Sequence, residues 1–198
     1  MSYVDGLPID KLTDQPSGIW DKIATELVGL AFRECFEWGL VQTDPNFSNY
    51  RYQPDTERIG LLDFGATRQY PPELVLKLRQ LITASLRQDR STIEQTALEV
   101  GYLDPTAPNI YREAIINLLL EVAEPAMQTG TYDFGRTDLA SRMRDQVLQL
   151  RLEQRYWHLP PVEILMLHRK LGGLYLMATR LQARVDVSAL IQPYLIES

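Results

Sequence analysis

The only clear β-strand signals in this 198-residue sequence stand next to each other near its start, between two polar segments. Residues 50–52 and 58–62 are aromatic or apolar enough for short strands, and Pro54-Asp55 between them is a turn signal. The polar segments, residues 42–49 and 63–68, carry aspartate and asparagine. A hairpin at this position would bring the two polar segments together, and this constrains the fold more than any other feature.

Helix signals dominate the rest of the chain. Ser17 can cap a first helix at about residues 19–37, and Gly39 can end it. Its apolar residues recur at helical spacing: Trp20, Ile23, Leu27, Leu30 and Ala31. Further helices are expected at about residues 71–88, 91–100, 109–127, 138–154, 160–183 and 187–196. The sequence therefore predicts one mainly α-helical domain with a small β hairpin.

Length, charge and cysteine content narrow the class of protein. The chain is long enough for one domain with a hydrophobic core. Its net charge is −6 without a lysine or arginine block, which argues against a nucleic-acid partner because phosphate binding needs a basic face. The single cysteine, Cys35, cannot form an internal disulfide, and this fits a reducing compartment.

The sequence shows neither a signal peptide at its start nor a membrane span. Residues 1–10 lack the apolar region of a signal peptide, and no apolar stretch reaches the roughly 18 residues that a membrane span needs. We therefore expect a cytoplasmic protein. Peripheral association with the inner membrane stays open.

Three oxygen-bearing side chains in the polar segments form a candidate phosphoryl-transfer site. Asp44 and Asn49 lie in the first segment, and Asp63 opens the second. Magnesium prefers carboxylate or amide oxygens together with phosphate oxygens, so Asn49 and Asp63 are candidate metal ligands. Asp44 can face the attacking hydroxyl or water as a base or orienting group. Asp-x4-Asn followed by Asp-Phe-Gly is the order of a protein kinase's catalytic and metal-binding loops.

Neither pattern is decisive alone. Asp-Pro and Ser-Asn are ordinary turn formers, and Asp-Phe-Gly occurs twice, at residues 63–65 and 133–135. The second copy follows a Thr-Gly-Thr turn rather than an apolar strand, so we expect a loop there, with Asp133 as a turn or capping acid. The first copy gains weight from the upstream Asp-x4-Asn and the hairpin.

Several other polar or small residues have open roles. Arg68 can pair with a phosphate, pair with Asp44 or remain a solvated charge. His168 is expected to form a structural hydrogen bond, because the only other histidine is His158. Gly172-Gly173 inside a helix costs about 1 kcal/mol per glycine relative to alanine, and close packing against a neighbouring helix is the expected reason.

Segments spread over nearly the whole chain resemble the ABC-one/UbiB family of atypical kinases (AarF-type, ADCK-like). Residues 42–50, Gln-Thr-Asp-Pro-Asn-Phe-Ser-Asn-Tyr, resemble its catalytic-loop motif in the variant of the mitochondrial ubiquinone-biosynthesis members. Residues 61–68, Leu-Leu-Asp-Phe-Gly-Ala-Thr-Arg, resemble its metal loop. Residues 167–173, Leu-His-Arg-Lys-Leu-Gly-Gly, resemble a helical motif near the C-terminus of its members.

The resemblance implies a protein-kinase-like C-terminal lobe over residues 1–198, with ATP and Mg2+ as cofactors. Within this lobe it implies a hinge-like segment at 1–10, a catalytic-loop-like segment at 42–49, a metal-loop-like segment at 63–68 and a helical remainder at 71–198. Asp44 would be the catalytic aspartate. Asn49 and Asp63 would bind the metal and the nucleotide, and Tyr3 and Val4 would contact adenine.

The resemblance also implies an activity and its partners. It implies ATP-dependent phosphoryl transfer or ATP hydrolysis linked to ubiquinone biosynthesis. The sequence has no Lys-x-Gly-Gln element and no phosphate loop ahead of Tyr3, so we expect the N-terminal lobe to be absent. Three explanations stay open: a fragment, a split gene whose N-terminal lobe is encoded separately and supplied in trans, or a start codon placed too late. Ubiquinone-biosynthesis proteins are the other expected partners. A non-catalytic pseudokinase-like scaffold or binding module, or a gene fragment, stays open as an alternative.

Overall fold

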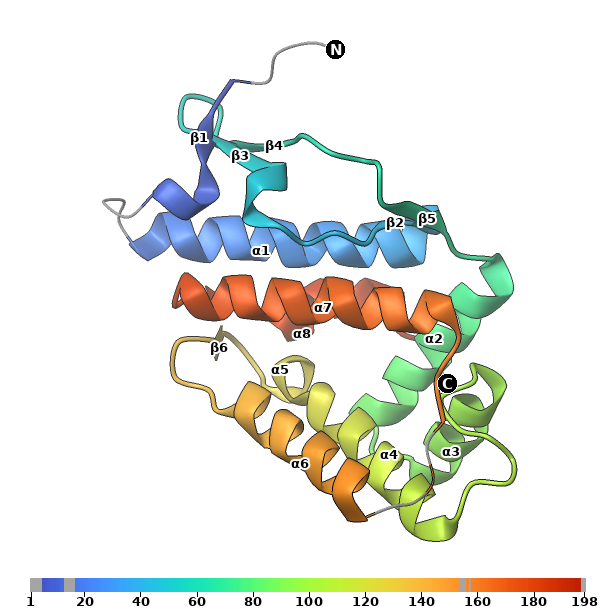
Figure 1. The fold of residues 1–198 in the computed structure, drawn as a ribbon. Helices are drawn as coiled ribbons and strands as arrows, with labels where there is room; N and C mark the ends of the chain where they lie inside the picture. The colour runs from blue at the N-terminus through green and yellow to red at the C-terminus, as the bar shows by residue number, and fades with distance from the viewer. Residues whose placement is uncertain (1–4, 13–16, 154–155, 157, 197–198) are drawn as a thin grey trace.

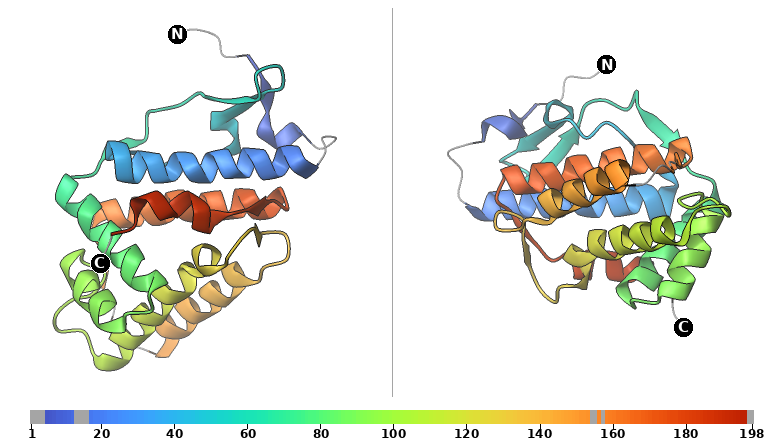
Figure 2. Two further views of the ribbon diagram at one scale, coloured as in Figure 1. Left: turned by 180° about the vertical axis from the view of Figure 1, so that it is seen from behind. Right: turned by 60° about the horizontal axis from the view of Figure 1, so that its bottom comes forward.

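A computed structural model describes residues 5–12, 17–153, 156 and 158–196 of the chain. The expected adenine contacts, Tyr3 and Val4, lie outside the described residues. Two long helices, α1 (Ser17–Arg33) and α7 (Val162–Arg180), lie side by side through the middle of the molecule (Figure 1). They separate the strands within residues 7–69 on one side from most of the remaining helices on the other (Figures 1 and 2).

The helical part follows the sequence prediction closely. Further α-helices in the described residues are α2 (Pro72–Leu86), α3 (Arg90–Glu99), α4 (Asn109–Val122), α5 (Glu124–Met127), α6 (Leu139–Glu153) and α8 (Val187–Ile191). The prediction of one helix at 109–127 was wrong in detail, since Pro125 disfavours a continuous helix and α4 ends before it. None of the described helices combines the length and the apolar character that crossing a bilayer requires.

A π-helical turn extends the first helix. Helix α1 ends at Arg33 and continues as the π-helical turn Glu34–Trp38. Gly39 ends this turn with a φ of 61°, a left-handed conformation that glycine adopts without steric cost. The expected end of the first helix at Gly39 is therefore confirmed.

The predicted hairpin is present, and the chain forms more strands than the sequence indicated. Strands β3 (Tyr50–Gln53) and β4 (Arg58–Leu61) pair antiparallel, with Tyr50 opposite Leu61. Strand β1 (Leu7–Pro8) pairs with β3 on its other side. A separate pair, β6 (Tyr132–Asp133) and β7 (Arg184–Val185), lies in the otherwise helical remainder of the chain.

A second antiparallel pair joins the two polar segments, where we expected only loops. Strands β2 (Leu40–Gln42) and β5 (Thr67–Gln69) pair with Gln42 opposite Thr67. The prediction of loop for Gln42 and for residues 67–69 was wrong because β2 has only three residues and β5 is polar and exposed, so neither shows a strand pattern in the sequence. This pair and the hairpin hold the two polar segments at both ends.

The hairpin is fixed over the two central helices by its aromatic side chains. Tyr50 and Tyr52 are buried, and they share one hydrophobic cluster with Leu27 of α1 and Leu174 of α7. Burial of an apolar side chain such as Leu27 or Leu174 contributes roughly 1.5–3 kcal/mol. The polar segments at the ends of the hairpin are therefore held in a set position above α1 and α7.

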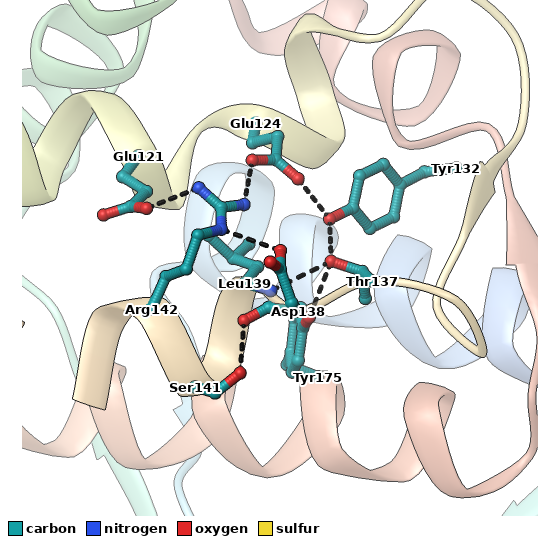
Figure 3. Close-up of polar contacts among 9 residues, drawn as sticks. All are labelled: Glu121, Glu124, Tyr132, Thr137, Asp138, Leu139, Ser141, Arg142 and Tyr175. Carbon is teal, nitrogen blue, oxygen red and sulfur yellow. Dashed lines mark hydrogen bonds and ion pairs between the residues drawn. The ribbon is translucent and has the colours of Figure 1, made fainter. Parts of the chain in front are cut away.

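Below the central helices, Arg142 joins three elements through an ion-pair network (Figure 3). Its guanidinium contacts Glu121 at the end of α4, Glu124 at the start of α5 and Asp138 just before α6. The Tyr132 hydroxyl of β6 donates to Glu124 at 2.6 Å. This network ties α6 to α4, α5 and the β6–β7 pair.

Candidate functional site

Gln42 joins the two polar segments. Its side-chain Nε2 donates to the backbone carbonyl of Asp44 at 3.1 Å and to that of Asp63 at 3.3 Å, and its Oε1 accepts from the Asp44 N–H at 3.1 Å. The Leu62 N–H also donates to the backbone carbonyl of Asn49 at 3.0 Å. Because Gln42 is buried, this bridge is shielded from competing water.

A small cavity lies between the segments. Its volume is about 10 Å3, close to the size that holds one water molecule. It is lined by Glu34, Gln42, Asn49, Tyr50, Leu61, Asp63 and Phe64. We expected Asp44, Asn49 and Asp63 around one cavity. The structure lines the cavity with Asn49 and Asp63 and places Asp44 beside it rather than in its lining.

Two side chains hold the Asp44 carboxylate. The Asn49 Nδ2 donates to Asp44 Oδ2 at 3.1 Å and to the Asp44 backbone carbonyl at 3.0 Å. Arg169 of α7 donates from Nη2 to Asp44 Oδ1 at 2.6 Å, a charge-assisted hydrogen bond. Arg68, which we considered as a partner of Asp44, is instead exposed on β5 opposite Val41.

Sequence reasoning missed Arg169. The two partners stand 125 residues apart, and no local pattern links a helix residue to a loop at that separation. The available signal was its place in the His-Arg-Lys run at residues 168–170, in which we predicted a role for His168 but none for Arg169. His168 itself contacts the Tyr102 hydroxyl through Nε2 at 2.5 Å, which fits the hydrogen-bonding role that we expected.

Hydrogen bonding fixes the orientation of the Asn49 side-chain amide. Both groups that its Nδ2 meets are oxygen atoms of Asp44, and only the NH2 end of an amide can donate to them. The Oδ1 of Asn49 is therefore the end that remains for other partners. Within the part of the chain that the structure describes, no hydrogen-bond donor engages this oxygen.

Asp63 offers a second oxygen to the same cavity. Its Oδ1 accepts from the Gly65 N–H at 2.7 Å, which fixes the carboxylate, while its Oδ2 has no hydrogen-bond donor among the described residues. An amide oxygen and a carboxylate oxygen suit Mg2+, which takes one or two protein ligands together with phosphate and water oxygens. The described residues contain no group of three or more His, Cys, Asp or Glu side chains that could hold a metal alone. This donor set therefore fits an ion that arrives with a phosphate ligand.

A buried ion pair borders the cavity. Glu34 of the π-helical turn and Lys170 of α7 lie with 2.9 Å between Oε2 and Nζ, and their side chains are 7% and 1% exposed. Burial raises the pKa of Glu34 above its usual value, and the charge and hydrogen bond of Lys170 partly offset this rise. π-helical turns occur frequently at functional sites, and this one carries a cavity-lining carboxylate.

Helix α7 also supports the segment that follows Asp44. A β-carbon at Gly173 would lie 2.1 Å from Pro45 Cγ, so a larger residue would displace that segment. The Arg180 guanidinium lies 5.3 Å from the centre of the Phe47 ring. We expected a neighbouring helix against the two glycines. The partner of Gly173 is instead Pro45, and Gly172 has open space around its Cα.

Comparison with known proteins identifies the family. Residues 1–97 match the family model of the ABC1 atypical kinase-like domain. The chain is 31% identical over 97% of its length to the mitochondrial atypical kinase COQ8B of Rattus norvegicus, and 33% identical over 94% to the mitochondrial atypical kinase coq-8 of Caenorhabditis elegans. Residues 1–97 thus belong to the ABC1 atypical kinase-like family, and the chain is similar to members of it over nearly its whole length.

The chain spans only part of these ABC1-family relatives. It covers 36% of the rat protein and 25% of the nematode protein. The fold is shared with Rv3197 of Mycobacterium tuberculosis, solved in complex with erythromycin, at a TM-score of 0.74 and 19% identity over 96% of this chain and 47% of that one. The mainly helical architecture with small antiparallel sheets is thus consistent with the fold that the ABC1 resemblance implied.

The ABC1-like Asp-Phe-Gly at residues 63–65 and its second copy have the same local geometry. Asp133 Oδ1 accepts from the Gly135 N–H at 3.0 Å, as Asp63 does from Gly65, so the expected turn role of Asp133 is confirmed. The prediction of a loop at this position was wrong for residues 132 and 133, which form strand β6. Their surroundings differ. Phe134 is buried, whereas Phe64 is 60% exposed at the edge of the cavity. The tripeptide therefore specifies the turn, and only its neighbours make the first copy a candidate site.

Proposed function

We propose that this chain carries the Mg2+–ATP site of an ABC1-type atypical kinase and serves phosphoryl transfer or ATP hydrolysis linked to ubiquinone biosynthesis. In this proposal residues 1–198 form a kinase-like C-terminal lobe, with 42–49 as catalytic loop and 63–68 as metal loop. The observation that carries it is the cavity that Asn49 and Asp63 share, with Asp44 bound to Asn49 beside it.

The donor set assigns a role to each residue. Asn49 Oδ1 and the Asp63 carboxylate would hold Mg2+, which neutralises charge on the ATP phosphates when bound. Asp44 would accept a hydrogen bond from the attacking hydroxyl or water and take its proton. Asn49 and Arg169 each engage one of its oxygens, and each carboxylate oxygen has a further lone pair.

This cavity of about 10 Å3 can contact the metal and phosphate end of a nucleotide but not its whole surface. We propose that an N-terminal kinase-like lobe, supplied in trans, forms the opposite wall, and that ubiquinone-biosynthesis proteins are further partners. The exposed Phe64 ring beside Asp63 is an apolar contact that such a lobe would cover.

Calorimetric titration with the nonhydrolysable analogue AMP-PNP, with Mg2+ or with EDTA, tests the site. Magnesium should strengthen binding to the wild-type chain, and Asp63→Asn should abolish that gain. Asp133→Asn is the matched control, since it changes the same tripeptide turn away from the cavity. Magnesium-independent binding in the wild type, or equal losses in both variants, would contradict the proposal.

A non-catalytic binding module is the second candidate. It is favoured by the large apolar residues that lie exposed on or beside the two polar segments: Trp38 at 54%, Leu40 at 48% and Phe64 at 60%. Surface exposure of this kind marks association sites when the residues lie together. Partner association without nucleotide, together with no ATP turnover once an N-terminal lobe is supplied, would favour this candidate over the first.

A further inference from the structure

We infer that Arg169 is a positioning residue of this site, which sets the orientation of the Asn49 amide through Asp44. The inference rests on the proposed metal role of Asn49 and adds a residue that lies outside the cavity lining. Its basis is a chain of contacts that starts on α7 and ends at the cavity: Arg169 to Asp44, and Asp44 to Asn49.

The first link fixes the carboxylate plane of Asp44. A carboxylate held at one oxygen can still rotate about its Cβ–Cγ bond, which is a soft torsion. Asp44 is held at both, because Arg169 donates to Oδ1 at 2.6 Å and Asn49 donates to Oδ2 at 3.1 Å. Without Arg169, Asn49 would be the one hydrogen-bond donor among the described residues that restrains the carboxylate group.

The second link passes this orientation to the cavity. Asn49 Nδ2 makes two hydrogen bonds, to Asp44 Oδ2 and to the Asp44 backbone carbonyl, and the first depends on the carboxylate orientation. These bonds keep Nδ2 on the side of Asp44, so Oδ1 is the end of the amide left for the cavity that Asn49 lines. An amide flipped by 180° would offer NH2 groups, which cannot bind a cation.

The helix from which this series of contacts starts is held in place although Arg169 is exposed. Its side chain is 59% exposed, but the next residue, Lys170, is fully buried in its ion pair with Glu34. One turn further along α7, Gly173 lies against Pro45, the residue after Asp44. The distance between α7 and the Asp44 segment is thus set independently of Arg169, and Arg169→Ala should change orientation more than fold.

The Asn49 side-chain NH2 signals in 15N NMR spectra, assigned with Asn49→Asp, test the orientation directly. In Arg169→Ala these signals should shift and exchange faster with solvent, and Arg169→Lys, which keeps one charged donor, should restore them in large part. Arg136→Ala is the matched control, since Arg136 is an exposed arginine 3.8 Å from Asp133 next to the second Asp-Phe-Gly. Unchanged Asn49 signals in Arg169→Ala would overturn the inference whether or not nucleotide binds.

Titration with AMP-PNP gives the functional readout. Arg169→Ala should weaken Mg2+-dependent binding about tenfold, the usual effect of losing a residue that orients a metal ligand, and leave binding in EDTA unchanged. Equal weakening with and without Mg2+ would mean that Arg169 contacts the nucleotide or supports the fold, and tighter binding would mean that it blocks the site. Either result would overturn the inference. A wild-type chain without any Mg2+ effect would instead refute the proposed function.

Discussion

Glu34 and Lys170 form an ion pair almost completely shielded from water, which joins the π-helical turn after α1 to the middle of α7. The pair borders the cavity lined by Asn49 and Asp63, and its Lys170 directly follows Arg169 in the sequence. Removing two charges from water has a large desolvation cost, so such a pair is weak evidence for high stability. Its role in this chain is to fix the position of α7 relative to the polar segments.

Breaking this pair should be strongly destabilising. Glu34→Leu or Lys170→Met leaves one buried charged group without its partner, and we expect a loss of about 3–5 kcal/mol in the free energy of unfolding. The double variant Glu34→Leu with Lys170→Met removes both groups and should recover most of the loss. Urea denaturation measures all three, and losses that simply add in the double variant would contradict the account.

The raised pKa of Glu34 predicts a specific pH dependence of stability. Burial, the larger cause, makes the folded state hold this proton more tightly than the unfolded chain, whose glutamate pKa is 4.5. The stability that this proton contributes is fully present below pH 4.5 and is lost as pH rises through the folded-state pKa. The free energy of unfolding from urea curves should therefore fall over that window in the wild type and stay flatter in Glu34→Gln. Identical slopes would show that Glu34 does not titrate in this way.

Two adjacent glycines should respond oppositely to alanine. Gly172→Ala adds a methyl group in open space and replaces a poor helix former, so it should stabilise the chain by about 0.5–1 kcal/mol. Gly173→Ala places a β-carbon against Pro45 and should destabilise it by about 1–3 kcal/mol. Thermal or urea unfolding of both variants checks this prediction, and stabilisation in both would show that Pro45 does not constrain α7.

The Arg142 network should matter more than an ordinary surface arginine. Hydrogen bonds to Glu124 and Asp138 hold the pKa of Arg142 above its usual value, and Glu121 is a third partner. Arg142→Ala should lower the melting temperature because it leaves these carboxylates together without their cation. Arg144→Ala, on the same helix with an exposed Asp145 partner, is the control and should have little effect. Equal melting temperatures of the two variants would show that Arg142 does not stabilise the fold through this network.

Local signals in the sequence predicted the parts of the fold that depend on neighbouring residues. The hairpin of β3 and β4 followed from strand residues around a turn, and the end of the first helix at Gly39 followed from a helix-ending glycine. The meeting of the segments that hold Asp44 and Asp63 followed from the hairpin between them. Each of these depends on contacts within about 25 residues.

Contacts that leave no pattern of their own in the sequence could not be predicted in the same way. Strand pairing of Gln42 with Thr67 has no apolar pattern, and the ion pair of Arg169 with Asp44 joins residues that are 125 positions apart. We predicted that Gly173 packs against another helix because it lies inside a helix. Its neighbour in space is Pro45, which is distant in sequence, so no local pattern pointed to it. A charged or small residue on a helix face shows what it can contact but not which distant segment it meets.

The central claim is that a divalent ion with nucleotide binds between Asn49 and Asp63. Replacing Mg2+ by paramagnetic Mn2+ in the presence of AMP-PNP tests it most directly, because Mn2+ broadens the NMR signals of nearby amides. The account predicts selective broadening of the Asn49 and Gly65 amide signals, with the Gly135 amide of the second Asp-Phe-Gly unaffected. Broadening centred on Gly135, or no selective broadening at saturating nucleotide, would contradict it.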